Sequence, residues 1–299
     1  MTTAGRVAPF GRMLTAMVTP FDADGALDLD AAATLATHLV DLGNEGLVVN
    51  GTTGESATTS DEEKAQVLRA VVAAVGDRAC VVAGVGTNDT RHTIELARAA
   101  QLAGADALLV VTPYYNKPPQ DALLAHFRAV ADATELPVMT YDIPARTGVA
   151  LHTETLLRLA EHPRIVANKD AKGDLFAATQ VMADSDLAYY SGEDALTLPL
   201  LAVGAVGTVS VTGHVVADRI AAMIDAYDAG HVERARRTNA ELVPVTVEIM
   251  TRMQGAVAVK AAMALAGVLA RRTVRLPLLA ATDEQVHTLQ VGLAKAGCL

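Results

Sequence analysis

Eight short apolar runs recur along the first two-thirds of the chain, and segments with helical periodicity separate them. The runs cover residues 13–20, 46–54, 80–87, 107–115, 137–144, 165–172, 187–192 and 208–213. Several of them are nearly continuous Val, Leu and Ala, which is typical of parallel strands that helices cover. Such strand–helix units, repeated about every 25–35 residues, favour a (β/α)8 TIM barrel of the α/β class. A doubly wound open sheet is the alternative, and the absence of a GxGxxG turn after the first run weakens it.

The segments between the runs carry helix-start and helix-stop signals. Ser60 precedes three acidic residues, as an N-cap does, and Asp89 precedes a helical segment that Gly104 ends. Beyond residue 215 only helices are predicted, over 215–227, 232–252, 256–269 and 283–296. Because this is more helix than closing a barrel needs, the sequence predicts a C-terminal helical extension at 229–299. The barrel is predicted at 13–228, and residues 1–12 before its first strand are predicted to be a flexible leader.

Composition and charge exclude several classes of protein. The 299 residues carry a formal net charge of −10, which disfavours a nucleic-acid partner because that role needs clustered cations. No apolar stretch approaches the roughly 18 residues of a membrane span, and residues 1–12 lack the apolar core of a signal peptide. Cys80 and Cys298 provide no disulfide framework, and the cysteines and histidines lack metal-ligand spacing. The sequence therefore predicts a soluble, cytoplasmic protein with no bound metal.

Lysine is scarce in this chain, with six residues against eighteen arginines. Lys169 stands within a strand-like run, whereas the others fall on predicted loops or helices. An ammonium group inside a barrel is unfavourable unless it is paired or neutralised, and desolvation lowers its pKa. A lysine so placed suits Schiff-base formation with a carbonyl substrate. A structural ion pair, with Asp170 or another acid, explains the placement equally well.

Three further strand ends carry polar residues, and the C-terminal ends of strands are where barrels place function. A GTTGES turn offers the hydroxyls of Thr52 and Thr53 to a carboxylate or phosphate, although such turns are usually structural. Tyr115 can relay a proton, or it can form an aromatic lid or a subunit contact. Tyr141 is a second candidate for proton transfer, and Arg146 offers a planar fork to a carboxylate unless it is a surface residue on a turn.

Taken in order, the segments GTTGES, PYYNKP, YDIPARTG, KDA and SGEDA resemble the motifs of the dihydrodipicolinate synthases, within the pyruvate-dependent Schiff-base aldolase superfamily. The resemblance runs from residue 14 almost to the C-terminus and looks closest to actinobacterial members. It implies a lyase of diaminopimelate and lysine biosynthesis that condenses pyruvate with L-aspartate 4-semialdehyde. It also implies catalysis without a metal or organic cofactor, in a homotetramer built as a dimer of dimers.

The resemblance implies a catalytic role for four of the candidate residues. Lys169 would form the imine with pyruvate. Tyr141 would shuttle protons, with Thr52 and Tyr115 completing the relay. The Tyr115 side chain would be handed across to the site of the neighbouring subunit, so that assembly would be part of catalysis.

The resemblance also implies a binding role for four others. Thr53, the backbone at Val209 and Gly192 would line the pyruvate pocket, and Arg146 would bind the carboxylate of the semialdehyde. Sialic acid lyases and sugar-acid aldolases typically lack an arginine at this place, and a site built for a carboxylate rejects a partner without one. Arg146 therefore favours the semialdehyde. Another aldolase of that superfamily and a non-catalytic binding barrel are the alternatives.

Two positions depart from the pattern of the family. Asn168 and Asp142 stand beside Lys169 and Tyr141. Strand alternation turns Asn168 away from the barrel interior, so its expected effect is structural and not catalytic.

The family's feedback site for lysine is also altered. Four of its residues are retained, namely Ser56, Ala57, Asn88 and Tyr114. Its usual histidines are replaced by Asp61 and Lys64, and the acid that holds the amine of lysine is replaced by His92. A cationic effector that faces Lys64 and His92 should bind poorly. The sequence therefore predicts weak or absent inhibition by L-lysine.

Overall fold

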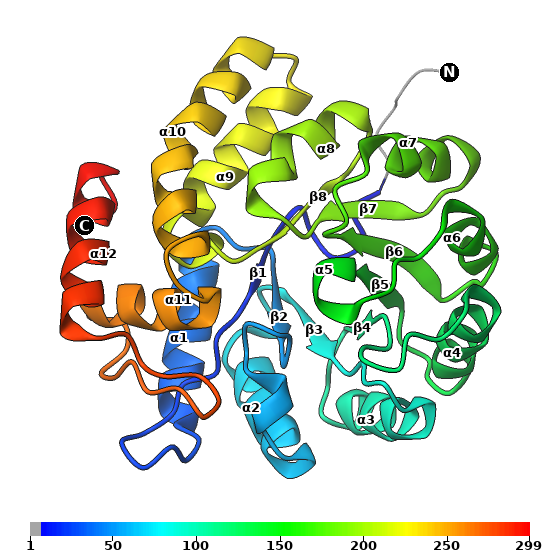
Figure 1. Cartoon of the computed structure of the whole chain (residues 1–299), viewed down its shortest axis with the longest axis horizontal. Helices are drawn as coiled ribbons and strands as arrows, with labels where there is room; N and C mark the ends of the chain where they lie inside the picture. The colour runs from blue at the N-terminus through cyan, green and yellow to red at the C-terminus, as the bar shows by residue number, and fades with distance from the viewer. Residues whose placement is uncertain (1–6) are drawn as a thin grey trace.

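A computed structural model, which describes residues 7–299, shows eight parallel strands closed into a barrel with helices around it (Figure 1). The strands are β1 (Met13–Ala16), β2 (Gly46–Val49), β3 (Cys80–Gly84), β4 (Ala107–Val111), β5 (Val138–Asp142), β6 (Ile165–Asp170), β7 (Ala188–Ser191) and β8 (Gly207–Ser210). The strands pair in sequence order, and β8 closes on β1, with Thr208 opposite Met13. The predicted (β/α)8 barrel is confirmed, and the open sheet is excluded because this sheet has no edge.

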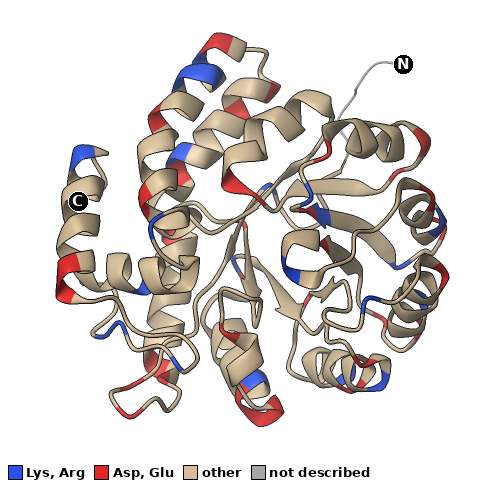
Figure 2. Ribbon diagram, viewed as in Figure 1, with Lys and Arg blue, Asp and Glu red and all other residues tan. Residues whose placement is uncertain are grey.

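Helices follow the strands around the barrel. They are α1 (Leu29–Asp41), α2 (Asp61–Val75), α3 (Thr90–Leu102), α4 (Gln120–Asp132), α5 (Pro144–Thr147), α6 (Thr153–Ala160), α7 (Leu175–Asp184), α8 (Thr197–Val203) and α9 (Gly213–Asp228), with short 3-10 turns η1 (Ser56–Thr58) and η2 (Asp194–Leu196). The predicted start of α2 is a capping box, in which Ser60 and Glu63 each accept the other's backbone N–H. Charged residues lie mainly on the helices and loops outside the barrel (Figure 2).

The C-terminal extension consists of α10 (Val232–Met250), α11 (Gly255–Leu265) and α12 (Asp283–Lys295). These helices pack together on one side of the barrel, where α10 contacts α8 and α9 (Figure 1). Within residues 7–299, no single helix is both long and apolar enough to cross a membrane, and only the sharply bent pair α10–α11 meets that test jointly. Residues 256–263 of α11 are all buried, although one of them is a lysine, Lys260.

The predicted flexible leader falls partly on residues 1–6, which lie outside the described residues. The rest of it is held in place. Phe10 is 2% exposed and donates its backbone N–H to the hydroxyl of Tyr190 at 3.2 Å. That hydroxyl in turn donates to the carbonyl of Gly11 at 2.9 Å. Because Phe10 precedes β1 and packs against the inward-facing Tyr190, it closes the N-terminal end of the barrel.

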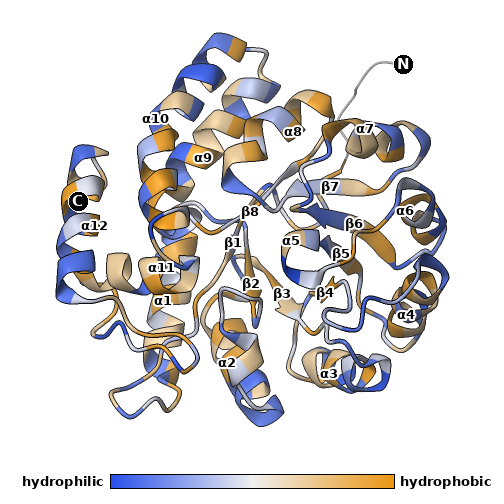
Figure 3. Ribbon diagram, viewed as in Figure 1, coloured by the Kyte–Doolittle hydropathy of each residue, from blue (hydrophilic) through white to orange (hydrophobic). Residues whose placement is uncertain are grey.

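Strand side chains alternate between the barrel interior and the layer beneath the helices. Tyr190 belongs to the interior cluster, whereas its neighbour Tyr189 packs in the outer one. On β5 and β6 the same alternation places Tyr141 and Ala167 inside. The end of β6 is hydrophilic among largely apolar strands (Figure 3), because Asn168, Lys169 and Asp170 follow one another there.

Candidate active site

A cavity of about 1010 Å³ lies over the carboxyl ends of β2 to β5 and is closed on one side by the C-terminal extension. Four of the residues predicted from the sequence line it, namely Thr52, Tyr115, Tyr141 and Arg146. The others are not in its lining: Thr53, Lys169 and Val209 are buried, and Gly192 is partly buried. The structure thus places the predicted residues at the carboxyl end of the barrel. We call the cavity that the first four residues line the chamber, and the buried group of the other four the floor.

Lys169 lies inside the barrel, level with Tyr141 on β5 and Tyr190 on β7. Its Nζ is 4.2 Å from the centroid of the Tyr141 ring, and the residue is 4% exposed. Burial lowers the pKa of Lys169 to about 8, even though the carboxylates of Asp194 and Glu193 act in the opposite direction. Such a lysine is partly neutral near pH 7 and can act as a nucleophile.

The ion-pair interpretation of Lys169 does not fit the geometry. Within residues 7–299, Lys169 makes no ion pair. The carboxylate of Asp170 instead accepts the backbone N–H groups of Lys172 and Gly173, both at 3.0 Å. The amine is therefore available for covalent chemistry.

Gly192 lies against the stem of Lys169. A Cβ atom at Gly192 would lie 2.9 Å from both Cγ and Cε of the lysine, closer than real Cβ contacts come. The glycine N–H donates to the carbonyl of Asp170 at 2.7 Å, which fixes the loop after β7 against β6. Glycine is thus required here by space, and not by a special backbone conformation.

Asp194, which is not among the residues predicted for the site, orders the loop that follows Val209. Its carboxylate accepts the backbone N–H groups of Val211 at 3.0 Å and Thr212 at 3.2 Å. The hydroxyls of Ser210 and Thr212 donate to it as well. The signal that could identify it is an acidic residue three positions after a strand end, with Ser210 and Thr212 at the end of the next strand.

Tyr141 is buried beside the lysine, and Arg146 faces the chamber. Burial raises the pKa of Tyr141 to about 12, so its phenol is neutral near pH 7 and can both donate and accept a hydrogen bond.

Arg146 sits on the four-residue helix α5, which ends at Gly148 with a left-handed φ of +78°. Within residues 7–299, nothing forms a hydrogen bond or ion pair with the Arg146 side chain. Its five donors are free to bind an anion.

Tyr115 extends away from its own chain. The residue is 88% exposed and has a left-handed φ of +73°, which is uncommon for a side chain of this size. The preceding Tyr114 is 39% exposed and lines the same cavity. This geometry does not bring Tyr115 into the buried floor beside Lys169.

Asn168 and Asp142 face the helices and not the barrel interior, as strand alternation predicts. Thr140 Oγ1 donates to Asn168 Oδ1 at 2.8 Å. Asp142 accepts the backbone N–H of Leu151 at 3.2 Å and lies 3.5 Å from Lys172 Nζ. Burial raises the pKa of Asp142 to about 6, because desolvation outweighs that cation. Asn168 and Asp142 therefore stabilise β5 and β6 from the side that faces the helices.

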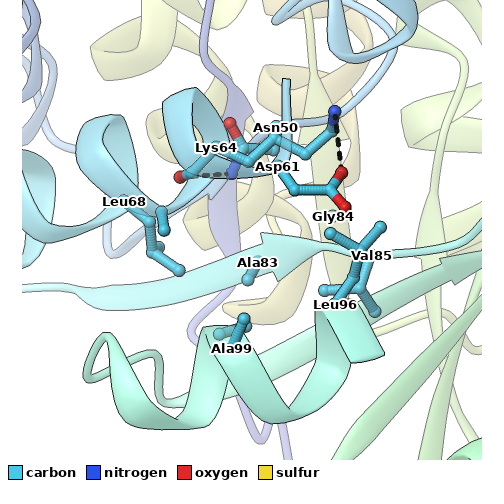
Figure 4. Close-up of a pocket in the computed structure, with 11 residues that line it drawn as sticks. Asn50, Asp61, Lys64, Leu68, Ala83, Gly84, Val85, Leu96 and Ala99 are labelled. Atoms are coloured by element: carbon cyan, nitrogen blue, oxygen red, sulfur yellow. Dashed lines mark hydrogen bonds and ion pairs between the residues drawn. The ribbon is translucent and has the colours of Figure 1, made fainter. Parts of the chain in front are cut away.

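The altered positions of the lysine site lie at the outer part of the same cavity. His92 Nε2 is 2.9 Å from Asp61 Oδ2, and Lys64 Nζ donates to the carbonyl of Thr59 at 2.5 Å. Figure 4 shows Lys64 and Asp61 beside a small neighbouring cavity of about 20 Å³, where Asn50 Nδ2 donates to the carbonyl of Lys64 at 3.0 Å. A free amine brought here would meet a lysine, and the carboxylate of Asp61 already pairs with His92.

Metal-binding geometry is lacking in the part of the chain that the structure describes. No group of three or more His, Cys, Asp or Glu side chains is arranged there to hold a metal ion.

Known proteins are similar to this chain in both sequence and fold. Residues 9–296 match the dihydrodipicolinate synthetase family. The 4-hydroxy-tetrahydrodipicolinate synthase of Acidothermus cellulolyticus is 64% identical, over 99% of this chain and 96% of its own length. The enzyme of that name from Kineococcus radiotolerans is 63% identical over the same shares. The crystal structure of dihydrodipicolinate synthase from Cyanidioschyzon merolae with lysine bound superposes with a TM-score of 0.94 at 41% identity, covering 97% of this chain and 99% of that one.

Proposed function

The chain belongs to the dihydrodipicolinate synthetase family and catalyses the 4-hydroxy-tetrahydrodipicolinate synthase reaction, and we propose that Lys169 carries this reaction through an imine with pyruvate. The observation that supports the proposal is the position of Lys169. Its amine is buried in the barrel interior, makes no ion pair within residues 7–299, and lies 4.2 Å from the Tyr141 ring centroid. A desolvated amine beside a phenol combines a nucleophile with a proton donor.

The neutral amine of Lys169 attacks the ketone carbon of pyruvate, and loss of water gives the imine. The pyruvate methyl group then loses a proton to form an enamine, whose carbon attacks the aldehyde carbon of L-aspartate 4-semialdehyde. The amine of the second substrate finally attacks the imine carbon, closes the ring and displaces Lys169. Covalent attachment makes the carbanion equivalent accessible near neutral pH without a metal or organic cofactor.

The surrounding residues bind and exchange protons in this scheme. Tyr141 passes protons during imine formation and ring closure, with Thr52 and Tyr115 completing the relay. The outward course of Tyr115 suits a side chain that enters the site of a neighbouring subunit. We propose that this subunit contact belongs to a homotetramer built as a dimer of dimers. Thr53, which is buried, receives the carboxylate of pyruvate through its hydroxyl in this proposal.

Two other residues complete the pyruvate pocket in this proposal. Gly192 and the backbone at Val209 line it, with the Asp194 contacts fixing the loop that follows β8.

We also propose a cytoplasmic location, because the cysteines Cys80 and Cys298 are both unpaired, which suits a reducing compartment.

The test is pyruvate-dependent consumption of L-aspartate 4-semialdehyde by the purified full-length chain. Turnover that requires both substrates, together with borohydride trapping of pyruvate on Lys169, is the expected result. Trapping of pyruvate without consumption of the semialdehyde would identify another pyruvate aldolase. Absence of both would contradict the imine mechanism.

Imine formation is expected to follow the ionisation of Lys169. Attack requires the neutral amine, so the rate of trapping should rise from pH 6 through the pKa of about 8 and then level off. At pH 7 the neutral fraction is about 300 times that of a lysine with a pKa of 10.5. The measurement is the initial rate of borohydride trapping at saturating pyruvate between pH 6 and 10. A rate still rising in proportion to hydroxide at pH 10 would show that burial does not lower this pKa.

L-Lysine is expected to inhibit the wild-type enzyme weakly or not at all. A cationic ligand at the outer part of the cavity meets Lys64, while the carboxylate of Asp61 is engaged by His92. Initial rates at rising L-lysine concentrations provide the measurement. His92→Glu supplies an acid for the ligand amine and should strengthen inhibition. A submillimolar inhibition constant for the wild type would show that the prediction is wrong.

A further inference from the structure

The turn that carries Thr52 and Thr53 ends in an unusual conformation. Glu55, the acid of the GTTGES segment, has φ +55° and ψ 37°, which is left-handed, and it is 5% exposed. A non-glycine residue adopts this conformation only where its surroundings hold it there. The partners of the Glu55 carboxylate therefore bear directly on the shape of this turn.

Both partners come from the C-terminal extension, more than 200 residues away in the sequence. Lys260 Nζ on α11 donates to Glu55 Oε1 at 2.5 Å, and the two side chains are 1% and 2% exposed. The backbone N–H of Arg275 donates to Glu55 Oε2 at 2.9 Å. Lys260 Nζ also donates to the carbonyl of Thr273 at 2.8 Å and lies 4.1 Å from the centroid of the Phe21 ring. Each oxygen of the buried carboxylate thus has its own donor.

The side chain of Arg275 anchors the same segment to the barrel. Its guanidinium forms a fork with Glu63 on α2, at 2.6 and 2.7 Å. It also donates to the carbonyls of Thr58 at 2.9 Å and Gly25 at 2.8 Å, and lies 4.2 Å from the Phe21 ring centroid. This fork, which lowers the pKa of Glu63 to about 2, fixes the connection between α11 and α12 beside the turn.

We propose that Glu55, Lys260 and Arg275 are positioning residues through which the C-terminal extension sets the conformation of the turn that carries Thr52 and Thr53. This inference rests on the proposed function, because it assigns Thr53 to pyruvate and Thr52 to the relay. Within residues 7–299, no hydrogen bond or ion pair joins any of the three to Lys169, so the proposal places their effect in the turn. Glu55 and Arg275 also line the active-site cavity, where a shift of the turn would change the cavity wall.

The physical consequence of losing Lys260 follows from the burial of Glu55. A carboxylate deprived of its buried cation must take up a proton or turn toward water. Either change removes the contact that holds the left-handed backbone, and the hydroxyl of Thr53, two residues earlier, moves with it. A displacement of about 1 Å at a substrate-positioning group lowers rates by about 100-fold.

Four variants test the proposal in the full-length enzyme. Lys260→Met keeps the apolar stem and removes the charge, Glu55→Gln keeps the shape, and a double variant combines both into a neutral pair. Arg272→Met is the matched control, because Arg272 pairs with Asp283 at 2.6 Å within the extension and does not contact the turn. Half-saturation by pyruvate is measured by borohydride trapping and by steady-state kinetics, with thermal unfolding followed in parallel.

Lys260→Met should lower kcat/KM for pyruvate by about 100-fold, and the double variant should regain about tenfold of that loss because it removes the unpaired charge. Arg272→Met should retain wild-type pyruvate saturation. If Lys260→Met unfolds, Glu55→Gln and the double variant carry the same comparison. Lowered unfolding temperatures with unchanged pyruvate saturation would overturn the positioning role. A wild-type enzyme that traps no pyruvate would instead contradict the proposed function.

Discussion

Replacing Lys169 by alanine is expected to reduce turnover by about 10⁴-fold or more, because removal of a covalent nucleophile eliminates the pathway and not merely one contact. The barrel interior contains no second lysine within the described residues that could take over, since Lys172 points to the outer face and donates to the carbonyl of Leu151. The measurement combines steady-state kinetics with mass mapping of the peptide that holds the reduced pyruvate adduct.

Two further variants separate the roles of charge and nucleophile. Lys169→Arg preserves the positive charge beside Tyr141 but forms no stable imine, so it should be as inactive as the alanine variant. Lys295→Ala changes an exposed lysine at the end of α12 and should behave as wild type. Substantial turnover by Lys169→Arg would mean that the residue acts through its charge alone.

Replacing Arg146 by alanine is expected to damage the use of L-aspartate 4-semialdehyde far more than the use of pyruvate. The free guanidinium in the chamber would otherwise hold a carboxylate through two charge-assisted hydrogen bonds. Losing such a contact corresponds to about 10²–10³-fold in kcat/KM for the semialdehyde. Trapping of pyruvate on Lys169 should change little in comparison.

The experiment has to allow for one electrostatic side effect. The guanidinium of Arg146 contributes to the lowered pKa of Lys169, so its removal slows imine formation somewhat at neutral pH. Comparing pyruvate trapping above pH 9 minimises this difference. Arg146→Lys keeps the charge but loses the fork and should recover only part of the activity. Equal damage to both substrates at high pH would contradict the role assigned to Arg146.

The barrel could be predicted because its signals are local. Runs of Val, Leu and Ala bounded by Gly, Pro and Thr predict buried parallel strands, and all eight begin within one residue of the expected position. Their ends were placed too late, since segments such as 17–20 and 50–54 continue the apolar or small-residue character while forming the loops above the strands. Hydrophobic pattern indicates where a strand begins, but hydrogen-bond pairing decides where it ends.

The candidate site residues that the sequence predicts are those that follow strand ends, and the residues it does not predict depend on distant contacts. Lys260 stands in an alanine-rich helix, and a lysine inside a fully apolar helix is a sign that an acid lies opposite. Nothing in the spacing identifies that acid as Glu55, 205 positions earlier. Phe10 was likewise assigned to a free leader, because a single aromatic residue carries no periodicity that would show it packing under the barrel.

The closed lower end of the barrel makes the active site a dead end. Phe10 packs against Tyr190 at the N-terminal end of the barrel, so both substrates have to enter and leave through the opposite end. Lys169 lies in the buried floor, and Arg146 is exposed in the chamber above. A semialdehyde bound to Arg146, as we propose, would stand between the mouth and Lys169. With the roles proposed for Lys169 and Arg146, this shape sets an order for the two substrates: pyruvate, which travels deeper, binds first, and the product leaves before the next round begins.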